Sequence, residues 1–500
     1  MIRSASNEGL AASSVSPVDS VDRAIQRARR LLPFFALATI PFCVLCLYVA
    51  ISDLRDYPGV DLRPKVAGAR ALAVGIDPYE PHASAQRGEY FKSNTVPNYT
   101  SALLALFIPL SGLPFETQRT IYFWLDWALA AGTFYLTQRT FCKQREWVYL
   151  FWIVYAIFIL CSYSFRFHLE RGQYYMLLLF LTSYAAASIQ NSWTSWPSCA
   201  PVALLLLIRP TYLLILPVAF ACLGARKWSL RVISIAIVMF LMTLHYGGIQ
   251  PWIKFVQVVH AVGVQHLATS KTLCCVPRSA PDYPANNVIE KTDFAKMLPP
   301  HAVNGTFIGM VSLGFVHAGR EIPSVCGFFS TEWIAKASYV FIGLILAGGL
   351  AVIQTARNRI VSRNVLITFM VLWPLILEIF GPERYFYTAV VEVLPLSMLL
   401  LDRDVFRHES RTNAGICRWL SLLALGVLPP AIFQLLPYMR FVSSLMSVLV
   451  LLVLPVSLAM FCVYTVLTSP KCIGDFHVYH LVALRSESTR RDPAILSSSA

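Results

Sequence analysis

The chain has 500 residues, of which 56% are hydrophobic and 14% charged, and its mean hydropathy is +0.59. Soluble domains carry about 25% charged residues, so this composition excludes a string of ordinary soluble domains and favours a surface solvated largely by lipid. The 41 Lys and Arg residues exceed the 27 Asp and Glu residues, for a net charge of +14. These basic residues gather in short segments between apolar stretches, as the positive-inside rule expects, and do not indicate a nucleic-acid partner.

Apolar stretches of about 20 residues, the length needed to cross a bilayer, recur along nearly the whole chain. They predict an all-α polytopic membrane protein with about twelve transmembrane helices within residues 31–468. We expect residues 1–30 and 469–500 to be cytoplasmic tails. The first apolar stretch is too long for a signal peptide, so we expect it to be a retained first helix. The expected spans are Leu31–Ile51, Arg119–Thr137, Trp147–Tyr163, Tyr174–Ile189, Ser198–Ile208, Thr211–Leu223, Leu230–Tyr246, Trp333–Ile353, Asn364–Phe380, Tyr385–Leu401, Trp419–Tyr438 and Val442–Leu467.

The basic clusters between the spans predict the topology. A single alternating assignment places every cluster, and both termini, on the cytoplasmic side. Two long loops, residues 52–118 and 247–332, then lie outside. The first holds an expected amphipathic helix at Lys65–Val74 and an apolar stretch, Ser101–Leu113, expected to lie on or dip into the membrane surface. The second keeps apolar pieces, so both loops are expected to carry juxtamembrane helices.

The twelve cysteines show no metal-ligand spacing, and no phosphate-binding, zinc or haem motif occurs, so we expect no metal and no cofactor. Cys274, Cys275 and Cys326 fall in the second loop. If that loop faces an oxidising compartment, a disulfide among them is one alternative. Asp126 lies inside an expected span beside Trp124 and Trp127, and we expect it to be a helix-packing partner.

Long outer loops on many helices suit an enzyme that meets a lipid-borne substrate at the outer leaflet. The first loop begins with Asp53, Asp56 and Asp61. Near a membrane surface, such a carboxylate can be a general base, a metal ligand or a solvated charge. Composition alone leaves these three roles open.

A set of short motifs follows in order along the chain. Asp61-Leu62-Arg63 precedes a segment of small residues and Gly75-Ile76-Asp77-Pro78-Tyr79. The later motifs are Asn98–Leu103 with Pro109-Leu110 and Leu113-Pro114, then Gly172-Gln173, Arg209-Pro210, Asn304-Gly305-Thr306 with Gly309, and Gly381–Tyr387. The ordered set resembles glycosyltransferase family 87, within the GT-C superfamily of polyprenyl-phosphate-sugar-dependent membrane glycosyltransferases. Three positions depart from its pattern: Pro64-Lys65 where an aromatic residue is usual, Thr100-Ser101 for Pro-Pro, and Tyr174 for Asn.

The resemblance implies a GT-C fold and transfer of a sugar, mannose by analogy, from polyprenyl phosphate to an extracytoplasmic glycan or lipid acceptor with inversion. Asp61 is the expected general base. Cations are needed at the departing phosphate, whose charge grows as the glycosidic bond breaks. The expected phosphate ligands are Arg166, His168, Arg171, Arg209 and Arg384, and the substrate contacts expected from the motifs are Tyr79, Tyr99, Gln173, Asn304 and Tyr387.

Each basic residue has a simpler alternative, since long cationic side chains at membrane depth also snorkel to lipid headgroups, and a lone histidine such as His168 is more often structural. The expected partners are the lipid-linked donor, the acceptor and the bilayer of the inner cell membrane. A secondary transporter or flippase is the main rival, but such proteins usually show internal repeats, and none is seen. An O-antigen-ligase-like enzyme is a second rival, although that class keeps its key basic residues in a later loop.

Overall fold

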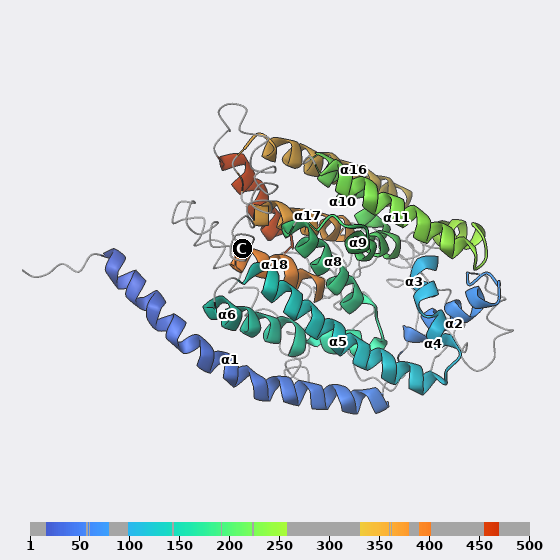
Figure 1. The fold of residues 1–500 in the computed structure, drawn as a ribbon, viewed down its shortest axis with the longest axis horizontal. Helices are drawn as coiled ribbons and strands as arrows, with labels where there is room; N and C mark the ends of the chain where they lie inside the picture. The colour runs from blue at the N-terminus through green and yellow to red at the C-terminus, as the bar shows by residue number, and fades with distance from the viewer. Residues whose placement is uncertain are drawn as a thin grey trace, which may run out of the picture.

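The structure is a computed structural model that describes residues 17–56, 59, 61–79, 99–142, 145–191, 193–222, 225–257, 331–359, 361, 363–379, 390–401 and 455–469. Over these residues the secondary-structure elements are helices, which confirms the all-α prediction for the described part of the chain (Figure 1). They include α1 (Pro17–Asp56), α2 (Leu62–Ala73), α3 (Ser101–Leu106), α4 (Ile108–Ser111), α5 (Phe115–Phe141), α6 (Arg145–Tyr155), the π-helical turn η2 (Ala156–Leu160), α7 (Tyr163–Arg171), α8 (Tyr175–Gln190), α9 (Trp196–Ile208), α10 (Pro210–Cys222), α11 (Arg226–Leu244), α16 (Thr331–Ala356), α17 (Arg363–Ile379) and α18 (Val393–Leu401).

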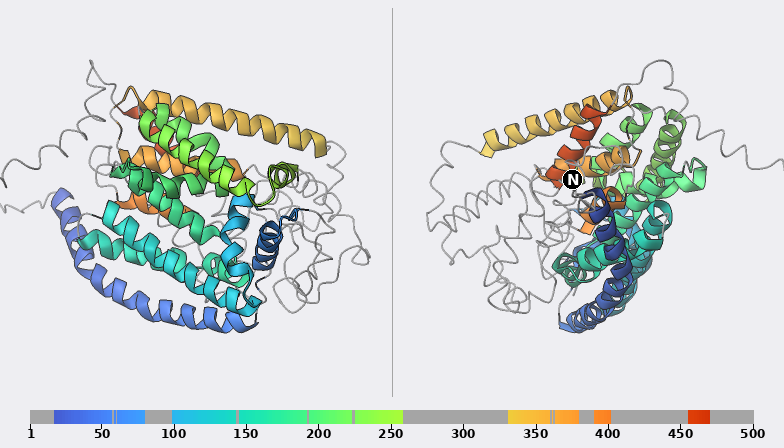
Figure 2. Two further views of the ribbon diagram at one scale, coloured as in Figure 1. Left: turned by 45° about the vertical axis from the view of Figure 1, so that its right-hand side comes forward. Right: turned by 90° about the vertical axis from the view of Figure 1, so that its left-hand side faces the viewer.

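The long helices form a bundle with α1 along one edge and α16 along the opposite edge (Figures 1 and 2). Between them, α5 packs on α8, α8 on α9, and α9 on α11. One continuous apolar cluster joins these helices, and it includes fully buried residues such as Leu178, Leu205 and Leu372. The short helices α2, α3 and α4 sit together at one end of the bundle (Figure 2).

Two of the described helical stretches, Arg30–Ser52 and Arg226–Leu244, are long and apolar enough to cross a membrane. Six shorter apolar helices accompany them: Tyr175–Gln190, Trp196–Ile208, Pro210–Cys222, Val340–Ala356, Asn364–Leu377 and Pro455–Thr468. On α1, Phe34, Leu37 and Tyr48 are 70%, 65% and 71% exposed, as a helix that faces lipid requires. The total of about twelve spans stays a prediction, because Trp419–Tyr438 and parts of Tyr385–Leu401 and Val442–Leu467 lie outside the described residues.

One expected span is divided. Trp147–Tyr163 corresponds to α6, the turn η2 and the first residue of α7. The break follows from local hydrogen bonding, because the Ser162 hydroxyl accepts from the N–H of Phe165 at 3.1 Å and so caps a new helix. Arg166, His168 and Arg171 therefore lie on a helix, α7, and not in a connecting loop.

The helix expected at Lys65–Val74 is present, but its expected position on the surface is wrong. The observed helix α2 begins at Leu62, and most of its residues are buried against α3 and α4. Small residues permit this packing: a Cβ atom on Gly68 would stand 3.0 Å from both δ-carbons of Leu104. The stretch Ser101–Leu113 forms α3 and α4. Four of the six residues of α3 are buried, but of α4 only Ser111 is, and Leu106 and Leu113 are exposed. The expected contact of this stretch with the membrane surface therefore stays a prediction.

Candidate active site

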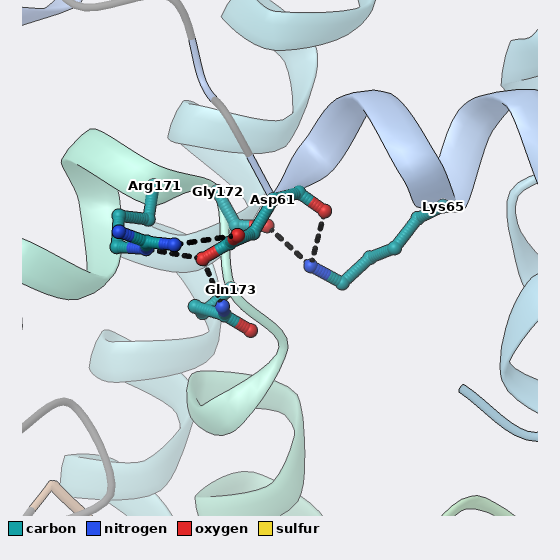
Figure 3. A network of polar contacts seen from close by, with 5 residues as sticks. All are labelled: Asp61, Lys65, Arg171, Gly172 and Gln173. Atoms are coloured by element: carbon teal, nitrogen blue, oxygen red, sulfur yellow. Dashed lines mark hydrogen bonds and ion pairs between the residues drawn. The ribbon is translucent and has the colours of Figure 1, made fainter. Parts of the chain in front are cut away.

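The carboxylate of Asp61 lies where the start of α2 meets the end of α7 (Figure 3). Its backbone N–H donates to the carbonyl of Arg171 at 2.9 Å. The Arg171 guanidinium binds the carboxylate in two places, with Nη2 donating to Oδ1 at 2.8 Å and Nε to Oδ2, and the amide of Gln173 also donates to Oδ2. The Asp61 side chain is 15% exposed and that of Arg171 37%, so the ion pair is accessible to a ligand.

A left-handed turn at Gly172 aims Arg171 and Gln173 at the same carboxylate. Gly172 ends α7 with φ +68°, and the N–H groups of Gly172 and Gln173 both donate to the carbonyl of His168, at 3.0 and 3.1 Å. Glycine favours such a helix terminus because it has no Cβ. Here a Cβ would also stand 2.6 Å from the Cβ of Leu62. The turn therefore packs directly against the start of α2.

The surroundings of Asp61 keep it ionised. Burial by itself would raise its pKa, but the charge and hydrogen bonds of Arg171, the charge of Lys65 and the hydrogen bond from Gln173 outweigh burial and hold the pKa below its usual value. The site therefore presents a fixed carboxylate at neutral pH.

Lys65 lies one helical turn after Asp61 and is fully buried. Its Nζ donates to the carbonyl of Asp61 at 2.9 Å and to the carbonyl of Gly172 at 2.7 Å (Figure 3). The rings of Tyr99 and Tyr174 lie 4.5 and 5.9 Å from Nζ. Burial lowers the pKa of Lys65 to about 7, against the attraction of Asp61. In the sequence, Lys65 stood out only as a departure from a family pattern. The feature that could have marked it as a site residue is that it is a lysine among small apolar residues.

Arg209 joins this cluster through tyrosine side chains. It lies between α9 and α10, where Pro210 begins the second helix, and its Nη1 donates to the hydroxyl of Tyr174 at 2.9 Å. The guanidinium carbon also lies 5.8 Å from the centre of the Tyr175 ring. Tyr174 in turn meets Tyr99 edge to face, with ring centroids 5.8 Å apart. Tyr174 thus links Arg209 to the group of aromatic rings beside Lys65.

Tyr79 anchors the first long loop. It is only 3% exposed, its hydroxyl donates to the carbonyl of Tyr99 at 2.5 Å, and its N–H donates to Oδ1 of Asp77 at 2.9 Å. Asp77 also pairs with Lys254 at 2.8 Å, which ties this turn to residues 250–257. In this structure Tyr79 therefore holds Tyr99 in place. Burial raises the pKa of both tyrosines.

His168 and Arg166 pair with acidic side chains other than Asp61. His168 is fully buried, and its Nε2 lies 3.2 Å from Oδ2 of Asp126 on α5, so Asp126 packs between helices as expected. Arg166 pairs with Glu170 at 3.0 Å, on the side of α7 that meets α1. Of the five basic residues predicted to bind phosphate, the described part of the chain brings Arg171 and Arg209 into the cluster. Arg384, Asn304, Tyr387 and the three loop cysteines lie outside the described residues.

No group of three or more His, Cys, Asp or Glu side chains suited to a metal ion occurs within the ranges that the structure describes. A comparison with curated proteins and one with solved structures found no match. The family model of glycosyltransferase family 87 matches residues 98–274. This range contains Tyr99, Arg171, Gln173 and Arg209 of the cluster, while Asp61 and Lys65 precede it. Over residues 98–274 the chain is thus similar to glycosyltransferase family 87, which confirms the predicted resemblance.

Proposed function

We propose that the protein transfers a sugar from a polyprenyl-phosphate donor to a glycan or lipid acceptor, with inversion and with Asp61 as the general base. The observation that supports this most directly is the ionised Asp61 carboxylate, bound by Arg171 and Gln173 and 15% exposed. The family match provides the reaction class, glycosyl transfer. Mannose is the sugar that the resemblance suggests.

The reaction is a single displacement. The acceptor hydroxyl attacks the anomeric carbon, its proton passes to Asp61, and the bond between that carbon and the phosphate oxygen breaks, so polyprenyl phosphate leaves with the bonding electrons. Arg171 and Arg209 stabilise the charge that grows on the departing phosphate. A guanidinium has five N–H donors, so Arg171 can hold the carboxylate along one edge and a phosphate oxygen along another.

The lowered pKa of Asp61 makes it a weak base, and the mechanism accommodates this. Glycosyl transfer passes through a transition state with oxocarbenium character. The acceptor oxygen becomes acidic only as its bond to the anomeric carbon forms. Asp61 therefore needs to be ionised and correctly placed at that moment, and its ion pair with Arg171 provides both conditions.

His168 and Arg166 take supporting roles in this proposal. His168 joins α7 to α5 through Asp126, and its carbonyl accepts the two N–H groups of the turn that carries Gln173. Arg384 stays a proposed phosphate ligand, and Asn304 and Tyr387 stay proposed substrate contacts, on the resemblance alone.

The identity of the sugar donor tests the proposal. Purified protein in lipid nanodiscs is given radiolabelled polyprenyl-phosphate-mannose or the matching nucleotide sugar, together with membrane glycolipid acceptors. We expect label transfer from the lipid phosphate only. Transfer from the nucleotide sugar alone would overturn the mechanism.

The site is proposed to open on the extracytoplasmic side. Single-cysteine variants at Ser84, in the first loop, and at Ser410, after the tenth expected span, are exposed to a membrane-impermeant thiol reagent in intact cells. We expect labelling at Ser84 and none at Ser410. The reverse pattern would overturn the topology.

A further inference from the structure

The ammonium of Lys65 joins two backbone segments that are far apart in sequence. One hydrogen bond reaches the carbonyl of Asp61 at the start of α2, and the other reaches the carbonyl of Gly172, 107 residues further along the chain. One carbonyl belongs to Asp61 itself and the other to Gly172, which follows Arg171 (Figure 3). The N–H of Asp61 also donates to the carbonyl of Arg171 at 2.9 Å and joins the same two segments.

A buried ammonium is an energetically costly way to join two segments, because a charge removed from water loses its hydration unless it is paired. Here two carbonyls and an aromatic face, Tyr99 at 4.5 Å, replace its water. The Gly172 carbonyl follows the last turn of α7, where the helix dipole favours a cation. An apolar side chain of similar length would pack there without the cost of the charge, so the charge itself points to a role.

We propose that Lys65 is a positioning residue for the transferase reaction: its ammonium holds the backbone of Asp61 against the turn after α7 and places a second positive charge beside the Asp61 carboxylate. The inference rests on the proposed function of Asp61 as the base. Lys65 itself does not contact the reacting atoms, since it is fully buried behind the Asp61 backbone.

The charged groups that face Lys65 come from each element packed around it. Asp61 on its own helix and Asp126 on α5 attract the ammonium, while Arg171 on α7 repels it. Tyr99 contributes a ring in the neutral form, since burial raises its pKa, and the ring of Tyr174 lies 5.9 Å from the ammonium. Among these, Asp61 is the carboxylate of the proposed reaction, and the charge of Lys65 lowers its pKa.

Two substitutions separate the charge from the hydrogen bonds. Lys65→Met removes both and keeps an unbranched apolar stem. Lys65→Gln removes the charge but retains an N–H donor. Arg70→Met is the matched control, because Arg70 also lies on α2 and also donates to two backbone carbonyls, those of Ser111 and Leu113. Arg70 lies in the last turn of α2, at the other end of this helix from Asp61.

The experiment measures kcat and the donor KM against pH, with polyprenyl-phosphate-mannose as the donor. For Lys65→Met we expect kcat to fall about 10²-fold, the size of effect that follows a displacement of about 1 Å in a catalytic group, with the donor KM close to wild type. Without the Lys65 charge the pKa of Asp61 rises, so the acid limb of kcat moves to higher pH. Lys65→Gln should show the same shift of the acid limb with a smaller loss of kcat. In Arg70→Met the acid limb should stay where it is in the wild type.

Unmoved acid limbs in both Lys65 variants would overturn the inference, and Lys65→Gln carries the measurement if Lys65→Met does not fold. Asp61→Asn, measured in parallel, separates this failure from failure of the proposed function. If Asp61→Asn is inactive and the Lys65 limbs do not move, only the role of Lys65 is lost. If Asp61→Asn keeps its turnover, Asp61 is not the general base, and the proposed role of Lys65 is refuted as well.

Discussion

Replacing Gly172 by alanine tests whether the turn after α7 builds the site. The residue has φ +68°, and the new Cβ would stand 2.6 Å from the Cβ of Leu62 and 3.5 Å from its Cα. Because Leu62 follows Asp61 directly, relief of this clash has to move the start of α2 away from α7. That movement separates Asp61 from Arg171 and the Gly172 carbonyl from Lys65.

The magnitude has three parts. A left-handed backbone at a non-glycine residue costs about 1–2 kcal/mol. The smaller conformational freedom of alanine in the unfolded chain offsets about 0.4–1 kcal/mol of this. Overpacking against Leu62 adds about 1–3 kcal/mol. We therefore expect Gly172→Ala to lower the free energy of unfolding by about 1–5 kcal/mol and to reduce kcat by about 10²-fold or more.

Gly75 provides a matched control. It has a similar φ, +72°, and follows the other end of α2, but a Cβ added there meets no atom within 4 Å. Gly75→Ala should therefore show only the backbone effect, no more than about 2 kcal/mol, and should keep its turnover. The two variants are compared by denaturant titration in mixed micelles and by donor turnover. Equal destabilisation of the two, or full turnover in Gly172→Ala, would refute the reasoning.

Three further predictions follow from the same contacts. Asp61→Asn keeps the shape of the side chain but accepts no proton, so kcat should fall about 10²–10⁴-fold while donor binding to nanodiscs persists; near-normal turnover would exclude Asp61 as the base. Gln173→Met removes a hydrogen bond that lowers the pKa of Asp61, so the acid limb of the kcat–pH profile should move to higher pH. The ion pair of Asp61 with Arg171 also stabilises the fold above about pH 4, and this stabilisation is lost as the pH falls through the lowered pKa of Asp61. His168→Phe leaves Asp126 buried without this partner, and the free energy of unfolding should fall by about 3–5 kcal/mol, with partial recovery in the double variant with Asp126→Leu; no change in the single variant would show that the contact is not stabilising.

Much of the helical framework could be predicted from local sequence. The expected spans Tyr174–Ile189, Ser198–Ile208 and Thr211–Leu223 differ from α8, α9 and α10 by at most two residues at either end. Apolar runs of this kind specify helices by themselves, since a backbone in lipid has to satisfy its own hydrogen bonds. Arg209-Pro210 marked the break between α9 and α10 because proline cannot continue the preceding helix without a lost hydrogen bond.

The burial of α2 was not predictable from its own residues. Lys65–Val74 carries Lys65 and Arg70 among small residues, a pattern that a surface helix also shows. Its packing depends on partners far along the chain, Leu104 beside Gly68 and the turn at Gly172 beside Leu62. No periodicity within α2 contains that information.

The sequence by itself selected Asp61, Arg171, Gln173 and Arg209 as candidate site residues, because ordered motifs and cations in unusual places can be seen without coordinates. Only the tertiary structure separated Arg171, which binds Asp61, from His168, which faces Asp126 one helical turn away. Only the tertiary structure assigned the buried ammonium of Lys65 to the carbonyls of Asp61 and Gly172. The physical reason is that a charge acts over a few ångströms, and which groups lie within that distance is decided by chain segments more than a hundred residues apart.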